Sequence, residues 1–312
     1  MVTGNGEHDA RITNDVEIRV YGLMRSGNHA IIQWVQNQFR GKVTCFLNNV
    51  DHGDHDPYAT NKARVLTGVE DDISTDALRR LEKALLIYSY EDRQILEQSG
   101  ADFVRSIFQQ RFEQNRERYF GASRHRFDVL ILRDPFNCFA SRIALISERG
   151  PVGGVSDVDI IASNWKVLAH RALEILRTAD PHSLVVSYNV WASDPAYRAR
   201  LSSALMGSFD DSTMTVTPHF GGGSSFSLDP ITVTTFARKW RLLLDPRTVK
   251  RVPEFWLRLR GPKQEDYLGR WKLYRCHDEY RRLFRDKEIA ELSEKLFGDI
   301  PGTRAFLRSL PH

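Results

Sequence analysis

Short apolar runs recur along the chain and alternate with longer segments of mixed character. The runs are rich in β-branched residues and are short enough to be buried strands. The predicted strands are residues 16–21, 43–47, 63–67, 84–88, 127–132 and 183–188. Near-continuous apolar strands that alternate with helices indicate a parallel sheet covered on both faces.

Between most of these runs, apolar residues recur with the period of a helix. Over residues 157–178, for example, Ile161, Trp165 and Leu168 fall on one face. Asp194 and Pro195 are the residue types expected at the N-cap and the first position of a helix. The predicted helices cover residues 30–39, 102–119, 157–178, 194–205, 280–284 and 289–297. Residues 208–229 are rich in Gly, Ser, Thr and Asp and are predicted to form a loop.

This alternation predicts the α/β class, with three layers in which helices flank a central parallel sheet. Of the 312 residues, 41% are hydrophobic and 27% are charged, so the chain can bury a full core and is not a disordered tail. We expect residues 1–15 to be a flexible leader and residues 16–312 to form a single domain.

The charge and the cysteines exclude several classes of protein. The net charge of +4 is small and evenly spread, which argues against a nucleic-acid partner and leaves room for a local basic pocket that binds one small anion. The three cysteines lack CxxC spacing, which suits a reducing compartment, and we expect all three to be buried. No apolar run approaches the length of a transmembrane segment, so we expect a cytoplasmic protein.

A glycine-bearing loop follows the first predicted strand. Gly22 and Gly27 have the separation of the two glycines in a Walker A loop, and they lie between a strand and a helix. Backbone N–H groups of such a loop and the N-terminus of the following helix bind phosphate oxygens. An ordinary strand-to-helix turn with glycines is the alternative interpretation of this segment.

The residues after the second glycine decide which chemistry the loop serves. A nucleotide triphosphatase needs Lys and then Ser or Thr there, the first to reach the β- and γ-phosphates and the second to bind magnesium. This chain has Asn28 and His29 instead, and it carries a cation, Arg25, inside the loop. The loop therefore favours a group that is transferred without magnesium.

A second anion-binding pattern begins at the end of the fifth predicted strand. Arg133 ends the strand, Asp134 and Pro135 begin a helix, and Ser141 follows eight residues after the arginine. Arg can bind two oxygens of a phosphate monoester and Ser a third. In a simpler interpretation, Asp134 pairs with Arg133 or Arg142 on the surface.

These two segments together resemble a known family. Residues 25–29, Arg-Ser-Gly-Asn-His, resemble the 5′-phosphosulfate loop of sulfotransferases, and residues 133–141 are similar to their 3′-phosphate motif. The order, the strand-to-helix contexts and the Arg-to-Ser spacing match. The resemblance implies a P-loop-like fold that binds 3′-phosphoadenosine 5′-phosphosulfate (PAPS) and transfers its sulfuryl group without a metal, leaving the bisphosphate PAP as product.

The resemblance extends to shorter segments further along the chain. It implies that Tyr188 contacts the adenine, although Asn189 stands where the family commonly has Glu. Residues 224–226 are similar to the segment that holds adenine, and Arg238 belongs to a basic pair similar to the one that returns to the 3′-phosphate. The resemblance thus implies donor contacts from Arg25, Ser26, Gly27, Asn28, His29, Arg133, Ser141, Tyr188, Ser224, Ser225, Phe226 and Arg238.

Transfer of the sulfuryl group needs a cation at the transferred group and a base for the acceptor. Arg25 is the expected cation. Glu91, three residues after the fourth predicted strand, and His29 are the two candidate bases, and we place Glu91 slightly ahead. For Glu91, the alternative is a charge that interacts with a helix dipole; for His29, it is donor binding.

The acceptor is less well specified by the sequence than the donor. We expect a hydroxyl of a small molecule or glycan, bound by loops over residues 48–62, 149–156 and 208–230. Residues 51–56 alternate Asp and His, but a hydrophilic loop explains them better than a metal site. A P-loop kinase and a catalytically silent PAPS- or nucleotide-binding module are the alternative functions.

Overall fold

The computed structural model describes residues 12–50, 56–60, 64–69, 73–91, 111–149, 158–212 and 269–310. The chain divides into two compact units. The first unit comprises Met1–Leu132 and His170–Val216, and the second comprises Arg133–Ala169 and Thr217–His312. The two units are distinguished by the contacts within each of them. This does not test whether residues 16–312 form a single domain, so that expectation stays a prediction.

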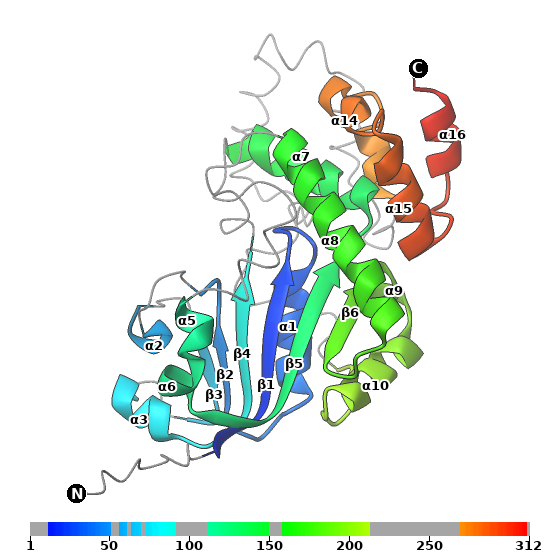
Figure 1. Ribbon diagram of the computed structural model, residues 1–312. Helices are drawn as coiled ribbons and strands as arrows, with labels where there is room; N and C mark the ends of the chain where they lie inside the picture. The colour runs from blue at the N-terminus through cyan, green and yellow to red at the C-terminus, as the bar shows by residue number, and fades with distance from the viewer. Residues whose placement is uncertain are drawn as a thin grey trace, which may run out of the picture. The chain divides into compact units, whose positions relative to one another are not determined.

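The first unit contains a six-stranded sheet in the order β3-β2-β4-β1-β5-β6 (Figure 1). The strands are β1 (Ile12–Gly22), β2 (Thr44–Leu47), β3 (Arg64–Thr67), β4 (Lys83–Tyr90), β5 (Ala122–Leu132) and β6 (Ser183–Ser187). β1 pairs in parallel with β4 and β5, and β2 and β6 continue the parallel order outward. The predicted α/β class is therefore confirmed. The sheet is mostly parallel, and β3 at one edge pairs antiparallel with β2.

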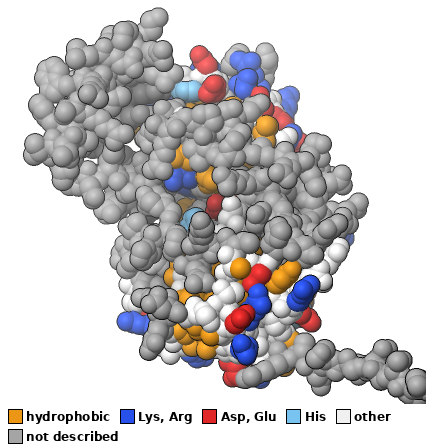
Figure 2. Space-filling view, turned by 90° about the vertical axis from the view of Figure 1, so that its left-hand side faces the viewer, with side chains coloured by type: hydrophobic (Ala, Val, Ile, Leu, Met, Phe, Trp, Pro, Cys, Tyr) orange, Lys and Arg blue, Asp and Glu red, His pale blue; other side chains and the backbone are white. Residues whose placement is uncertain are grey.

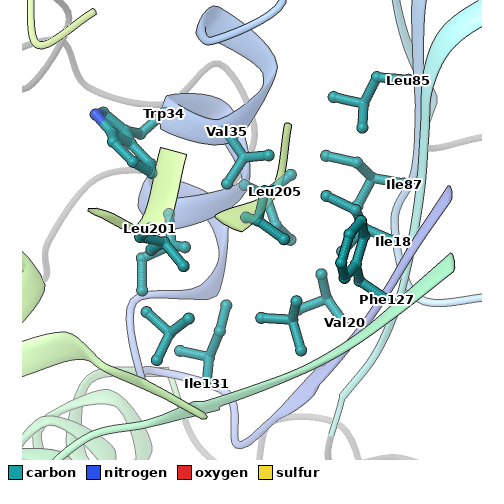
Figure 3. Packing of buried hydrophobic residues seen from close by; sticks show 14 of the residues in the cluster. Ile18, Val20, Trp34, Val35, Leu85, Ile87, Phe127, Ile131, Leu201 and Leu205 are labelled. Atoms are coloured by element: carbon teal, nitrogen blue, oxygen red, sulfur yellow. The ribbon is translucent and has the colours of Figure 1, made fainter. Parts of the chain in front are cut away.

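One face of the sheet is apolar because alternate residues of its strands are apolar. Ile18 and Val20 of β1 belong to a core cluster with residues of α1 (Asn28–Asn37) and α10 (Pro195–Ala204). Figure 3 shows Trp34 and Val35 of α1 in this cluster. Burial of these side chains fixes α1 against the sheet, and with it the loop that precedes α1.

The other face of the sheet carries buried charges, which the sequence analysis missed. Two short helices meet this face, α5 (Arg111–Gln114) and α6 (Arg116–Phe120). Arg19 of β1 pairs with Glu113 of α5 at 3.0 Å and donates to Asp128 of β5 at 2.8 Å. Glu17 pairs with Arg116 of α6. Helices on both faces give the first unit the predicted three layers.

The boundaries of several elements differ from the predictions. β1 begins at Ile12. The predicted helix over residues 102–119 is described only from residue 111, where two short helices replace one long helix. Three short helices of the first unit were not predicted: α2 (Pro57–Thr60), α3 (Thr75–Arg80) and α9 (Tyr188–Ser193). The predicted N-cap of α10 is confirmed, because Asp194 Oδ1 accepts a hydrogen bond from Ala196 N at 2.8 Å.

The second unit is helical in its described part. Its elements are α7 (Pro135–Arg149), the first half of α8 (Val158–Thr178), the 3₁₀ turn η2 (Arg270–Leu273), α14 (Asp278–Leu283), α15 (Lys287–Phe297) and α16 (Thr303–Arg308). Aromatic rings form its core: Phe136 of α7 stacks on Phe284 with 4.5 Å between ring centroids. The predicted C-terminal helix pair corresponds to α14 and α15, whereas α16 was not predicted.

The described surface shows no concentration of one charge on the face in Figure 2, where acidic and basic side chains lie interspersed. Two of the cysteines, Cys45 and Cys138, are buried as expected, and Cys276 is exposed, which corrects the prediction for that residue. Within the described residues, no helix is long and apolar enough to cross a bilayer.

Candidate functional site

The loop between β1 and α1 has backbone dihedral angles of alternating hand. Arg25 has φ of +75° and Gly27 has φ of +92°, whereas Ser26 between them has a negative φ. Ser26 N donates to Leu23 O at 3.1 Å, which closes the turn. Successive residues of opposite hand point their N–H groups into one concavity, which binds anions. The loop thus has the alternation of φ signs that is typical of anion-binding backbones.

The N-terminus of α1 continues this concavity. Gly27 is the N-cap residue and provides no side-chain cap. The first N–H groups of a helix lack carbonyl partners within the helix, and the helix dipole makes this end electropositive. The backbone N–H groups of Asn28 and His29 lie in this first turn. The predicted donor-contact residues Ser26, Gly27, Asn28 and His29 therefore follow Arg25 within one turn of the chain.

Both glycines are required by close packing. A Cβ atom on Gly22 would lie 2.7 Å from the carbonyl oxygen of Ile131 in β5, and one on Gly27 would lie 2.1 Å from the ring of Tyr188. The structure therefore brings Tyr188 to the loop, although Tyr188 is not the last strand residue as predicted. It begins α9, because the Ser187 side chain caps that helix by accepting from Val190 N.

Glu91 reaches the loop from the neighbouring strand. It follows β4 directly, and its side chain is buried. Tyr90 and Tyr21 pair in register, so β4 and β1 end at the same edge of the sheet. Asn28 Nδ2 donates to Glu91 Oε1 at 3.0 Å and to Leu23 O at 3.1 Å. A candidate base thus contacts the first residue of α1.

His29 is held by residues at the ends of β2 and β4. Its Nε2 lies 3.1 Å from Asn48 Oδ1, which also accepts a hydrogen bond from Ser89 Oγ at 3.3 Å. An amide oxygen only accepts, so Nε2 carries the proton in this pair and Nδ1 is the basic nitrogen of the neutral ring. His29 is half-buried.

The segment with the second anion-binding pattern belongs to the second unit. Asp134 caps α7, since its Oδ1 accepts from Asn137 N at 2.8 Å, and Pro135 is the first helical residue, as predicted. Arg133 follows β5 directly and is fixed by a hydrogen bond of 2.8 Å from Trp165 Nε1 to its carbonyl oxygen. Arg133, Asp134 and Arg142 are all buried, so none of them lies on the surface, where the simpler interpretation expected them. Ser141 is buried as well.

Comparisons with known proteins found no matching family model and no matching curated protein. The sulfotransferase domain of the Synechococcus PCC 7002 olefin synthase matches with 13% identity and a TM-score of 0.43, over 93% of this chain and 98% of that chain. Mouse sulfotransferase SULT7A1 complexed with PAP matches with 12% identity and a TM-score of 0.39, over 86% of this chain and 88% of that chain. At this similarity, neither likeness assigns a role to a residue of this chain.

Part of the predicted site lies outside the described residues. Ser224, Ser225, Phe226 and Arg238 belong to this part, as do most residues of the three predicted acceptor loops. Of the predicted hydrophilic loop over residues 51–56, the structure describes only Asp56. Within the described ranges, no three His, Cys, Asp or Glu side chains gather as metal ligands would.

The polar residues that hold the two candidate bases were not predicted from the sequence. Asn49 Oδ1 accepts from Glu91 N at 3.2 Å, and Asn49 N donates to Ser89 Oγ at 2.9 Å. Asn49 has φ of +56°, a left-handed conformation that Asn adopts more readily than most residues. Two consecutive Asn residues directly after a predicted strand were the available signal.

Proposed function

We propose that this chain is a sulfotransferase, which transfers the sulfuryl group of PAPS to an acceptor hydroxyl of a small molecule or glycan. The S–O bond to the donor phosphate breaks, a new S–O bond to the acceptor oxygen forms, and the acceptor proton passes to a base. PAP is the other product. The observation that carries the proposal is the loop of residues 23–27 with the two residues that follow it. The loop combines alternating φ signs with a cationic side chain, and Asn28 and His29 stand where a magnesium site needs Lys and then Ser or Thr.

The loop supports a sulfuryl donor more than a nucleoside triphosphate. The alternating backbone and the α1 N-terminus provide N–H donors for phosphate or sulfuryl oxygens. Arg25 adds a positive charge where negative charge develops on the bridging oxygen. Asn28 and His29 replace the Lys and the hydroxyl residue that magnesium-dependent phosphoryl transfer uses.

The same proposal assigns the 3′-phosphate of the donor to Arg133 and Ser141, with a contribution from Arg238. Replacement of Arg133 by Ala should weaken PAP binding by roughly 2 to 4 kcal/mol, because a charge-assisted contact with a phosphate is lost. Isothermal titration calorimetry measures this loss. An exposed arginine of the second unit, Arg304, provides the control, and Arg304→Ala should keep the affinity. Unchanged affinity in Arg133→Ala removes Arg133 from the site.

Tyr188 supports an adenine-binding role for this end of β6. Its ring lies against Gly27, and its centroid lies 5.8 Å from that of Trp191 with an interplanar angle of 34°. A ring next to the anion loop suits the base of an adenosine phosphate, because bases stack on aromatic side chains. We assign Tyr188, with Ser224, Ser225 and Phe226, to the adenine.

Glu91 and His29 are the two candidates for the base that accepts the acceptor proton. Glu91 is buried beside the loop and accepts a hydrogen bond from Asn28, whereas His29 leaves Nδ1 to accept a proton. Separate Glu91→Gln and His29→Ala variants distinguish them. The variant that lacks the base should lose turnover by about 100-fold or more while it keeps PAP affinity. If both variants turn over normally, neither residue is the base.

A thermal-shift comparison of PAP with ATP plus magnesium tests the donor class. PAP should raise the melting temperature, and ATP with magnesium should raise it less, because a ligand stabilises the state that binds it. The reverse order favours a P-loop kinase. Transfer of labelled sulfate from PAPS to a panel of hydroxyl acceptors then tests the activity. PAP binding without any transfer favours the silent binding module.

A further inference from the structure

The side chain of Asn28 joins the anion loop to Glu91. Its Nδ2 donates to two acceptors, Leu23 O at the start of the loop and Glu91 Oε1 after β4. The residue is only 4% exposed, so these bonds form away from water. A buried carboxylate oxygen that accepts from a fixed amide has one defined position.

The orientation of the Asn28 amide follows from what lies next to its oxygen and what lies next to its nitrogen. Its Oδ1 is buried without a hydrogen-bond partner among the described residues. A Cβ atom on Gly22 would lie 2.9 Å from this oxygen, so only a glycine leaves room for it. Because both acceptors lie on the Nδ2 side, the amide has one favourable orientation.

Glu91 is also held through its backbone. Its N–H donates to Asn49 Oδ1 at 3.2 Å, and Asn49 is in turn fixed to Ser89 of β4 by a bond of 2.9 Å from its own N–H. Asn49 therefore fixes where the Glu91 backbone leaves the strand, and Asn28 fixes where the carboxylate lies. A base that is held at both ends needs little reorganisation before proton transfer.

We propose that Asn28 is a positioning residue, whose side-chain amide fixes the Glu91 carboxylate beside the anion loop in the orientation that accepts the acceptor proton. This inference rests on the proposed function and gives Asn28 a role beyond the predicted donor contact. The backbone N–H of Asn28 remains available for the anion, while the side chain serves the base.

Titratable or charged side chains also belong to the segments next to Glu91. Arg25 lies in the loop and His29 on α1, while Tyr90 of β4 donates its hydroxyl to Glu113 at 2.7 Å on the other face of the sheet. The residues from the end of β2, Asn48 and Asn49, are neutral. The pH dependence is therefore measured in the His29→Ala background as well as in the native chain.

Asn14 offers a closely matched control at the other end of β1. It is fully buried, its Nδ2 donates to Phe120 O at 2.9 Å and to Ser123 Oγ at 3.1 Å, and its Oδ1 also lacks a partner among the described residues. Asn28→Ala and Asn14→Ala thus remove the same kind of buried amide. Only the first removes a donor to Glu91.

The experiment compares turnover, PAP affinity and the pH profile of kcat in these variants. Asn28→Ala should lower kcat by about 10- to 100-fold with PAP affinity nearly unchanged, because the carboxylate loses its fixed position. The acid limb of the profile should move to higher pH than in the native chain, since a donor to the charged carboxylate is lost. Asn14→Ala should change neither. Equal turnover and equal profiles in the two variants overturn the proposal.

A second variant and an activity-free measurement complete the test. Should Asn28→Ala fail to fold, the uncharged variant Asn28→Ser replaces it, and its shorter side chain should move the acid limb in the same direction. If the native chain transfers no sulfuryl group, the proposed function fails, and the Glu91 carboxyl is followed by ¹³C resonance instead. Its titration midpoint should rise in the Asn28 variant and not in Asn14→Ala. An unmoved midpoint overturns the role of Asn28.

Discussion

Arg25 combines a charged side chain with a left-handed backbone, at φ of +75°. This conformation costs a non-glycine residue about 1 to 2 kcal/mol, because Cβ approaches the backbone too closely. The loop would be more stable with glycine at this position. Strain that is kept at one residue is typical of functional sites, where the side chain contributes to binding or catalysis.

Replacement of Arg25 by Ala and by Gly separates these two properties. Both variants should lose most of the PAP affinity, because both remove the cation from the loop. Arg25→Gly should be more stable than Arg25→Ala by about 1 kcal/mol, since glycine adopts the left-handed conformation without strain. Calorimetric titration and urea denaturation measure the two effects. Equal stability of the variants would show that the backbone is not strained, and full affinity would show that Arg25 does not bind the donor.

Among the elements, the strands were easier to predict than their directions and ends. Runs such as residues 127–132 are apolar on both faces, so burial alone indicates a strand there. The antiparallel direction of β3 follows from long-range pairing with β2, which no local pattern encodes. Tyr188 extends an apolar run, but the hydroxyl of Ser187 begins a helix at that point. The local signals of strand and helix overlap there, and the capping interaction decides the outcome.

Gly27, at the start of α1, packs against Tyr188, the first residue of α9, and this contact can be tested by substitution. Gly27 and Gly41 both have positive φ, at +92° and +79°, but a Cβ on Gly41 would meet nothing within 4 Å. Gly41→Ala should therefore cost only the strain of about 1 to 2 kcal/mol. Gly27→Ala should cost more in urea denaturation, because it also displaces the Tyr188 ring.

The double variant Gly27→Ala/Tyr188→Ala provides the control for this steric conflict. The two substitutions should cost less together than the sum of their separate costs, since removal of the ring opens space for the methyl group. If the losses of unfolding free energy are additive, the methyl group at residue 27 and the Tyr188 ring do not clash.

At the scale of the molecule, charged side chains are buried as well as apolar ones. The burial of the charged side chains could not be predicted from the sequence. Glu17 and Arg19 alternate with apolar residues of β1, which is also the pattern of a strand with one face in water. Their burial depends on partners such as Glu113 and Arg116, which come from helices about one hundred residues away. The same limit applied to the candidate site: the loop was predictable from local spacing, whereas the contacts of Asn28 and Asn49 depend on the sheet.

Buried titratable groups make the stability of the protein depend on pH in the alkaline range. Lys83 is 2% exposed and donates to Leu78 O at 3.1 Å and to Leu81 O at 2.8 Å, and burial lowers its pKa to about 8. Between about pH 8 and its ordinary pKa of 10.5, the unfolded chain binds more protons at this lysine than the folded chain does. The free energy of unfolding should therefore rise with pH in this window, by up to about 1.4 kcal/mol per pH unit.

Near the upper end of this window the buried tyrosines reverse the trend in the free energy of unfolding. Burial raises the pKa of Tyr21 to about 12 and the pKa values of Tyr88 and Tyr90 well above 10, so the folded chain keeps protons that the unfolded chain loses. Stability should therefore fall as the pH rises above about 10. Urea denaturation from pH 7 to 11 measures both limbs. Lys83→Met should abolish the rise between pH 8 and 10 and leave the fall in place, because the tyrosines are unchanged; a rise that persists in this variant would assign it to another group.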